Sequence, residues 1–400
     1  MRINIIRGQN QIGGSIIEVS SCSTRILLDA GSELEEKDPV APPIDGLFLG
    51  NASFQAAFIS HYHGDHIGLC DKILPEIPIF IGKAAGRVTN AARAYMKKPE
   101  YRFSGFYESE KPLVVGDMVV TPYLCDHSAF DAYMFHIACN GKTALYTGDF
   151  RSHGRKNFCA LLEKIPQVDV LITEGTTLTR SPARSVSEVA LEQQAFQILS
   201  QTEGPAFVLM AGTNIDRLVT VYKAARQANR VLLQDLYLAA ISTAAGGNIP
   251  RPRDFLDVRV FTTTGADERY EQLKSYGNAR IGKDQIANLD QRFVMCVRPS
   301  MRTYLEKLSK LKSFDNGVLL YSMWEGYKEH ADIEDFLNFM RAKGVRIVSL
   351  HTSGHADCDT IDALVEKIKP SVIIPVHTEN SAWFSRYQDI DIVEDQVFSF

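Results

Sequence analysis

Residues 56–66 have the sequence AAFISHYHGDH, in which an apolar run is followed at once by three histidines and one aspartate. The apolar run predicts a buried strand, and the glycine within HYHGDH predicts a turn directly after it. Alternate side chains of an extended chain point the same way, so His61 and His63 share one direction. Asp65 and His66 lie beyond the turn and face a neighbouring point. Imidazole and carboxylate are the ligands that zinc takes in hydrolytic sites, so the motif predicts a metal site rather than a polar surface loop.

Length and composition describe a globular chain with material for two domains. The chain has 400 residues, of which 45% are hydrophobic and 23% are charged. We find neither a run of about 18 to 20 apolar residues that could span a bilayer nor the start of a signal peptide. We therefore expect a cytoplasmic protein with no membrane contact. The net charge of −5 excludes a uniformly basic coat, so a nucleic-acid substrate needs a confined basic channel.

The first 177 residues have the pattern of a sheet whose strands end in polar residues. The expected strands are residues 25–31, 56–60, 119–124, 133–139, 143–149 and 168–175. A helix is expected at residues 83–96, and residues 97–117 are expected to form a loop.

From residue 178 the pattern changes to alternating helices and strands, which predicts a separate α/β unit with a parallel sheet. The expected helices are residues 187–202, 214–227 and 331–343, and the expected strands are residues 206–212, 231–236, 293–297 and 317–324. After residue 345, strands again end in histidines.

HYHGDH matches the signature H-x-H-x-D-H, and on this motif the chain resembles the metallo-β-lactamase superfamily. The resemblance implies that His61 and His63 bind one metal ion and that Asp65 and His66 bind a second. Further motifs of the superfamily occur in the same order along the chain. They are Asp29 as a residue that orients ligands, His127 and His377 as ligands, and Asp149 as the bridge between the two ions.

His377 follows Asp149 by 228 residues (377 − 149), which is far more than the superfamily spacing. We therefore expect a metallo-β-lactamase αββα sandwich that is interrupted by an inserted α/β domain. The expected boundaries are 1–177 for the first part of the sandwich, 178–345 for the insertion and 346–400 for the returning segment. An insertion of this size resembles the β-CASP group of nucleases.

Three motifs of the β-CASP group occur in order, namely Glu174 in LITEGTT, His355 in HTSGHA and His377 in IIPVHTE. Two metal ions can activate a water and stabilise the charge on an attacked phosphate. A poor leaving group still needs a proton, and His355 can donate it if an acidic partner orients the imidazole. Glu174 is the candidate partner. Asp65 is counted with these two as catalytic as well as a metal ligand.

Substrate-binding candidates lie near strand ends. Gly212, Thr213 and Asn214 precede an expected helix whose free N–H groups suit a phosphate, although an ordinary strand-to-helix turn explains them equally well. Ser353 and Gly354 can donate to the scissile phosphate, and Arg298 and Arg302 can line a basic channel.

The leading hypothesis is a zinc-dependent ribonuclease with two zinc ions, which manganese can replace in an assay. RNA is favoured over DNA because β-CASP members that act on RNA have histidine at the position of His377, whereas DNA-repair members tend to have valine. The alternative is a small-molecule metallohydrolase, such as a lactonase or thioesterase, with the insertion as a lid. A third reading is a metal-bearing scaffold that binds nucleic acid without cutting it. The mode of cutting, the particular RNA and the oligomeric state stay open, with a dimer among the alternatives.

These ligands predict two metal ions per chain. His61, His63 and His127 lie on one side, Asp65, His66 and His377 on the other, and Asp149 between them. Elemental analysis of purified protein is expected to give two equivalents of metal, and one equivalent or none would contradict the assignment.

Overall fold

The computed structural model describes residues 1–34, 36, 38–179, 185–263, 267–290 and 292–400. The chain divides into two compact units, unit 1 with Met1–Ser185 and Gly354–Phe400, and unit 2 with Val186–Ser353. The chain thus crosses between units after residues 185 and 353, eight residues later than the expected boundaries after 177 and 345. The assignment of the units to named domains stays a prediction.

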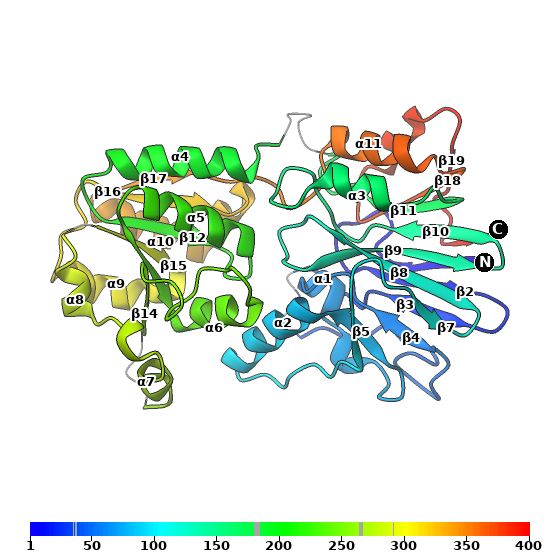
Figure 1. The fold of residues 1–400 in the computed structure, drawn as a ribbon, viewed down its shortest axis with the longest axis horizontal. Helices are drawn as coiled ribbons and strands as arrows, with labels where there is room; N and C mark the ends of the chain where they lie inside the picture. The colour runs from blue at the N-terminus through cyan, green and yellow to red at the C-terminus, as the bar shows by residue number, and fades with distance from the viewer. Residues whose placement is uncertain (35, 37, 180–184, 264–266, 291) are drawn as a thin grey trace. The chain divides into compact units, whose positions relative to one another are not determined.

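Unit 1 contains two seven-stranded sheets (Figure 1). Sheet 1 has the order β20 (Val397–Ser399), β1 (Arg2–Arg7), β2 (Ile16–Ser20), β3 (Arg25–Leu28), β4 (Ala56–Phe58), β5 (Ile79–Gly82) and β6 (Gly105–Tyr107). Sheet 2 has the order β19 (Asp391–Ile392), β18 (Val372–Val376), β11 (Val170–Glu174), β10 (Lys142–Tyr146), β9 (Ala132–Cys139), β8 (Met118–Cys125) and β7 (Leu113–Val115).

The core of unit 1 follows the two-residue period of its strands. On β10, Ala144 and Tyr146 pack against side chains of sheet 1, including Ile17 and Phe58. Leu145 between them points to the other face of sheet 2 and packs under helices. One apolar layer therefore joins the two sheets, and a second joins sheet 2 to its helices.

Helices cover the outer faces of unit 1. They are α2 (Lys83–Tyr95), α3 (Phe158–Lys164) and α11 (Cys358–Ile368), whereas the short helix α1 (Gly64–Ile67) follows β4. α3 and α11 lie together over sheet 2 (Figure 1), and α2 contacts β5 of sheet 1. This arrangement confirms the predicted αββα sandwich.

The region expected to be a loop, residues 97–117, contains the edge strands β6 and β7. Each has three residues, which is too short for a two-residue period to be recognised in the sequence. The prediction of a continuous loop was therefore wrong at these two places.

Unit 2 contains a parallel six-stranded sheet, as its alternating pattern predicts. Its order is β14 (Val258–Phe261), β13 (Val231–Asp235), β15 (Phe293–Val297), β12 (Ala206–Met210), β16 (Gly317–Ser322) and β17 (Val345–Ser349). β17 pairs with β16, which is why the crossing to unit 1 comes after this strand.

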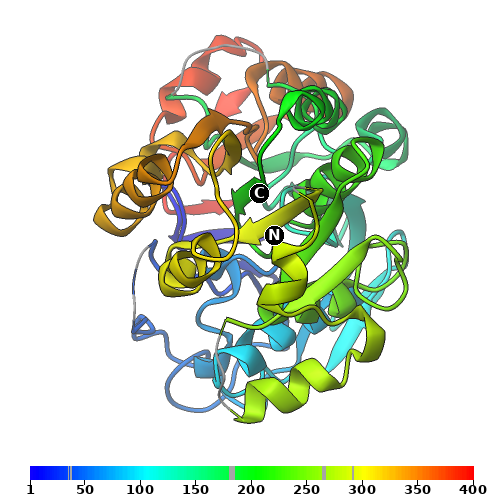
Figure 2. The same ribbon diagram turned by 90° about the vertical axis from the view of Figure 1, so that its left-hand side faces the viewer.

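Helices lie on both faces of the unit 2 sheet. They are α4 (Glu188–Gln201), α5 (Ile215–Gln227), α6 (Leu236–Ala245), α7 (Asp267–Lys274), α8 (Lys283–Ala287), α9 (Arg302–Ser309) and α10 (Ala331–Ala342). Figure 2 shows α4 and α5 in green on one side of the strands and α9 and α10 in yellow and orange on the other. Ser187, Asn214 and Asp235 cap α4, α5 and α6 with their side chains. Among the described helices, none is both long and apolar enough to cross a membrane.

A buried ion pair ties α4 to α5. Arg217 donates to the Glu188 carboxylate at 3.0 Å, and both side chains are fully buried. Arg217 also donates to the Leu350 carbonyl, and the Thr220 hydroxyl donates to Glu188. The pair thus joins two helices to the end of β17.

We predict that Arg217→Met lowers the free energy of unfolding by about 3–5 kcal/mol, because Glu188 is left buried without its counter-charge. Urea unfolding measures the change. Arg226→Met on the same helix is the control, since its ion pair with Asp257 is exposed and is expected to contribute about 0–1 kcal/mol. Equal effects of the two substitutions would contradict this account.

Candidate metal centre

Strand direction in sheet 2 brings four of the candidate residues together. β8 and β10 are both antiparallel to β9, and β10, β11 and β18 are mutually parallel. The carboxyl ends of β8, β10, β11 and β18 therefore lie at one edge of the sheet. His127, Asp149 and His377 follow three of these strands, and Glu174 is the last residue of β11.

Sheet 1 supplies the remaining ligand-type residues from the strands β3 and β4, which are parallel. Asp29 follows β3, while His61 and His63 follow β4. The short helix α1 begins directly afterwards and carries Asp65 and His66.

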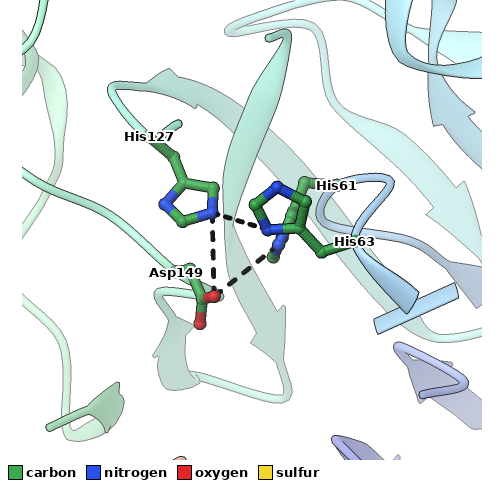
Figure 3. Close-up of side chains that lie close together, drawn as sticks. All are labelled: His61, His63, His127 and Asp149. Carbon is green, nitrogen blue, oxygen red and sulfur yellow. Dashed lines mark hydrogen bonds and ion pairs between the residues drawn. The ribbon is translucent and has the colours of Figure 1, made fainter. Parts of the chain in front are cut away.

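The first group of side chains consists of His61, His63, His127 and Asp149 (Figure 3). Asp149 Oδ2 lies 3.6 Å from His61 Nε2 and 3.8 Å from His127 Nε2. His127 Nε2 lies 3.1 Å from His63 Nδ1. In Figure 3 the three rings and the carboxylate converge on one small volume.

The second group lies on the other oxygen of Asp149. Asp149 Oδ1 is 3.3 Å from His66 Nε2 and 3.9 Å from His377 Nε2. His377 Nε2 is also 3.1 Å from Asp65 Oδ2. The two oxygens of one carboxylate thus face two different groups of imidazoles.

The donor atoms of this cluster fit a cation. Ligand atoms of His61, His63, His127 and Asp149 lie within 4.8 Å of one another, and those of Asp65, His66 and His377 do likewise. Among the described residues, His61 Nε2, His66 Nε2 and both Asp149 oxygens are buried and have no hydrogen-bond partner. Buried polar atoms of native proteins nearly always have a partner, so their convergence here indicates that the cluster can hold metal ions.

Burial favours the neutral form of three imidazoles, those of His61, His63 and His127. It lowers the pKa of His61 and His127 well below the usual value, and lowers the pKa of His63 to about 4. A neutral imidazole has a lone pair to offer a metal. Burial also lowers the pKa of His66, but Asp149 and Asp29 outweigh it and raise that pKa well above the usual value.

Asp29 lies behind the second group, in hydrogen-bond contact with His66. Its carboxylate accepts hydrogen bonds at 2.7 Å from His66 Nδ1, the Ser60 hydroxyl and the Tyr146 hydroxyl, and at 2.6 Å from the Ser60 backbone N–H. The Ser60 hydroxyl in turn accepts from His61 Nδ1 at 3.0 Å. These bonds leave the Nε2 atoms of both histidines directed at the cluster.

Carbonyl and hydroxyl oxygens orient two further histidines. His127 Nδ1 donates to the Gly354 carbonyl at 2.6 Å. His377 Nδ1 donates to the Thr176 hydroxyl at 2.8 Å, and that hydroxyl donates to Glu174 at 2.6 Å. Glu174 is therefore linked to His377 through the Thr176 hydroxyl.

His355 lies beside the cluster and hydrogen-bonds to Glu174. Its Nδ1 donates to Glu174 Oε2 at 2.9 Å and lies 3.5 Å from Asp149 Oδ2. Its side chain keeps 20% of its exposure, whereas Glu174 is fully buried. Burial lowers the pKa of His355, but the carboxylates of Glu174 and Asp149 outweigh it and raise the pKa to about 9. The imidazole thus holds a proton at neutral pH.

Most of the substrate-binding candidates belong to unit 2. Gly212, Thr213 and Asn214 form the turn between β12 and α5, where Asn214 caps the helix. Arg298 follows β15 and donates to Asp235.

Of the other substrate-binding candidates, Arg302 forms an exposed contact and Gly354 contacts a histidine of the metal cluster. Arg302 donates to the exposed Asp335. Ser353 ends unit 2, whereas Gly354 is in unit 1 and accepts from His127. The structure thus gives a direct link to the metal cluster for Gly354.

Three residues of the site were not predicted: Ser60, Tyr146 and Thr176. Ser60 directly precedes HYHGDH, and Thr176 lies two residues after Glu174, so their places along the chain were a usable signal. Tyr146 reaches Asp29 across 117 residues, a contact that no local pattern reveals.

Comparisons with known proteins agree with this geometry. Residues 12–186 match the family model of the metallo-beta-lactamase superfamily, and residues 342–387 match the model of a Zn-dependent metallo-hydrolase RNA specificity domain. A solved structure of a protein of unknown function from Enterococcus faecalis V583 superposes with a TM-score of 0.82, covers 100% of this chain and 99% of its own, and is 19% identical.

Curated relatives cover most of this chain at low identity. Ribonuclease J of Sinorhizobium meliloti is 24% identical over 87% of this chain and 62% of its own. Ribonuclease J of Helicobacter pylori strain 26695 is 20% identical over 95% of this chain and 56% of its own. The RNase J-like protein of Methanocaldococcus jannaschii is 24% identical over 96% of this chain and 92% of its own. The chain thus spans about three fifths of the length of the first two.

We predict that Asp29→Asn weakens metal binding about 10- to 100-fold, because the new NH₂ group opposes the donors of Tyr146 and His66. Competition with a chelator measures the affinity. Asp131→Asn is the matched control, since Asp131 also has a positive φ and accepts from a tyrosine hydroxyl and from backbone N–H groups, at the start of α2. Equal affinities of the wild type and Asp29→Asn would contradict the orienting role.

Proposed function

We propose that the chain, of which residues 12–186 match the model of the metallo-beta-lactamase superfamily, is a metal-dependent phosphodiesterase that cleaves RNA. The observation that carries the proposal is Asp149, whose two oxygens face two separate groups of imidazoles next to a His355–Glu174 pair. The match to an RNA specificity domain and the relatives named ribonuclease J support RNA as the substrate. They do not favour the lactonase or thioesterase alternative.

We assign two ions to the cluster, with zinc as the metal since imidazole-rich sites suit it. His61, His63 and His127 would hold one ion, Asp65, His66 and His377 would hold the other, and Asp149 would contact both. Bound there, divalent ions supply charge stabilisation for a phosphate and lower the pKa of a water.

The residues of the chain supply orientation and a proton. Glu174 accepts from Nδ1 of His355, so the proton that His355 can give away is on Nε2. General acid catalysis places such a proton on the leaving oxygen as the P–O bond breaks. Phe150 N–H and the Thr176 hydroxyl also donate to Glu174 and hold its carboxylate in place. Cleavage on this scheme leaves a 5′-phosphate and a 3′-hydroxyl.

We predict that His355→Ala retains its metal and binds RNA nearly as well as the wild type, while its cleavage rate falls about 10²- to 10⁴-fold. Glu174→Gln is expected to lose less, since it removes the charge but not the shape of the partner. His66→Ala is expected to lose metal as well as activity. The rates are measured on one RNA labelled at the 5′ end or at the 3′ end, so that release of mononucleotides from one end is distinguished from internal cutting.

The control is His136→Ala, which changes a histidine on β9 outside the cluster. A wild-type rate for His355→Ala would show that the proton donor is misassigned. RNA and a small ester are assayed side by side with the wild type and with His355→Ala. If the wild type hydrolyses the ester and His355→Ala hydrolyses it equally fast, the result favours the small-molecule alternative.

A further inference from the structure

The loop between β1 and β2, residues 8–15, contacts two candidate metal ligands that lie 312 positions apart in the sequence. The backbone N–H of His377 donates to the Gly8 carbonyl at 2.7 Å, and the N–H of Ser15 donates to the Asp65 carbonyl at 2.9 Å. Asp65 and His377 are the pair whose side chains lie 3.1 Å apart. One short loop of sheet 1 therefore holds the backbone of both residues.

The backbone of His377 needs such a support. Its φ is +50°, in the left-handed region that side chains other than glycine adopt rarely and at a cost. His377 follows β18 of sheet 2, whereas Gly8 follows β1 of sheet 1. The hydrogen bond thus joins the two sheets at the point where this ligand leaves its strand.

Asp65 is held by close backbone packing on a second loop. A Cβ added to Gly31 would lie 1.8 Å from the Asp65 carbonyl oxygen, so glycine is required for this approach. Gly31 N–H donates to the Ser15 carbonyl at 2.9 Å. The loop at Gly31 and the loop at residues 8–15 therefore enclose Asp65 together.

Arg7 ties these two loops to each other. Its Nε donates to the Gly14 carbonyl at 3.0 Å, and its Nη2 donates to the Gly31 carbonyl. Its Nη1 lies 3.4 Å from Glu33 Oε1. The side chain is 16% exposed, so its fork of donors is directed mainly at protein carbonyls rather than at water.

The other group of ligands depends on different supports. His127 is oriented by the Gly354 carbonyl, and His61 is oriented by Ser60. A substitution of Arg7 is therefore expected to displace Asp65 and His377 more than the ligands of the other group.

We propose that Arg7 is a positioning residue, which sets the separation of Asp65 and His377 through Gly14 and Gly31 and thereby the affinity for one of the two metal ions. The inference rests on the proposed function, since it requires two ions with separate ligand groups.

The test is Arg7→Met in the 400-residue chain, which keeps an unbranched apolar stem and removes the donors of the guanidinium group. Metal-depleted protein is titrated with Zn²⁺ against a chelator. We expect one ion to bind about 10- to 100-fold more weakly while the other keeps its wild-type affinity. Arg25→Met is the matched control, since Arg25 also bridges two partners, Glu18 and Ser53, at the opposite end of β3 from Asp29.

A second measurement needs no metal. Hydrogen exchange of the metal-free protein is followed in peptides that contain residues 62–70 and 372–380. We expect faster exchange in both segments of Arg7→Met and unchanged exchange in Arg25→Met, because Arg7 holds the loop that accepts from His377 and donates to Asp65.

The outcomes separate the inference from the function on which it rests. If wild-type protein binds two ions and Arg7→Met binds both with wild-type affinity, or loses both equally, the inference is overturned and the function stands. If wild-type protein binds fewer than two ions, the two-metal function is wrong and the affinity claim falls with it. Unchanged exchange in both segments of Arg7→Met overturns the positioning role regardless of metal.

Discussion

The site depends on one buried carboxylate, that of Asp149, which is surrounded by imidazoles on both of its oxygens. Burying a charge costs free energy unless opposite charges or hydrogen bonds compensate it. Burial raises the pKa of Asp149, but the neighbouring histidines, among them His377 and His66, outweigh it and lower the pKa well below the usual value. The carboxylate is thus ionised, and the arrangement is that of a cation site.

The fold brings these side chains together because several strands of sheet 2 end at one edge. β8, β10, β11 and β18 end side by side, so His127, Asp149, Glu174 and His377 need no long loops to meet. Behind them, the Nδ1 atoms of three histidines are hydrogen-bonded to Asp29, Ser60 and Thr176. Tyr146 in turn donates to Asp29. Each of these bonds settles which ring nitrogen carries a proton, and so which one is free for a metal.

Much of this could be predicted from the sequence because its signals are local. HYHGDH combines four ligand-type residues in six positions, and the order of motifs in the superfamily that the chain resembles implies Asp29, His127 and Asp149. The alternation of helix and strand expected for residues 178–345 likewise predicts the parallel sheet that unit 2 contains. Strands of three residues, such as β6 and β7, were missed because so short a run has no measurable period.

The sequence by itself thus determined which residue types are present for metal chemistry and in what order, since ligand spacing and strand patterning are properties of neighbouring residues. The tertiary structure alone decided which atoms meet. Asp65 and His377 are separated by 312 positions, and Tyr146 and Asp29 by 117, yet both pairs are in hydrogen-bond contact. The two oxygens of Asp149 face different groups, and Gly8 supports His377, because strands from distant parts of the chain and from both sheets end close to one another. That convergence depends on sheet order and strand direction, which no local stretch of the chain specifies.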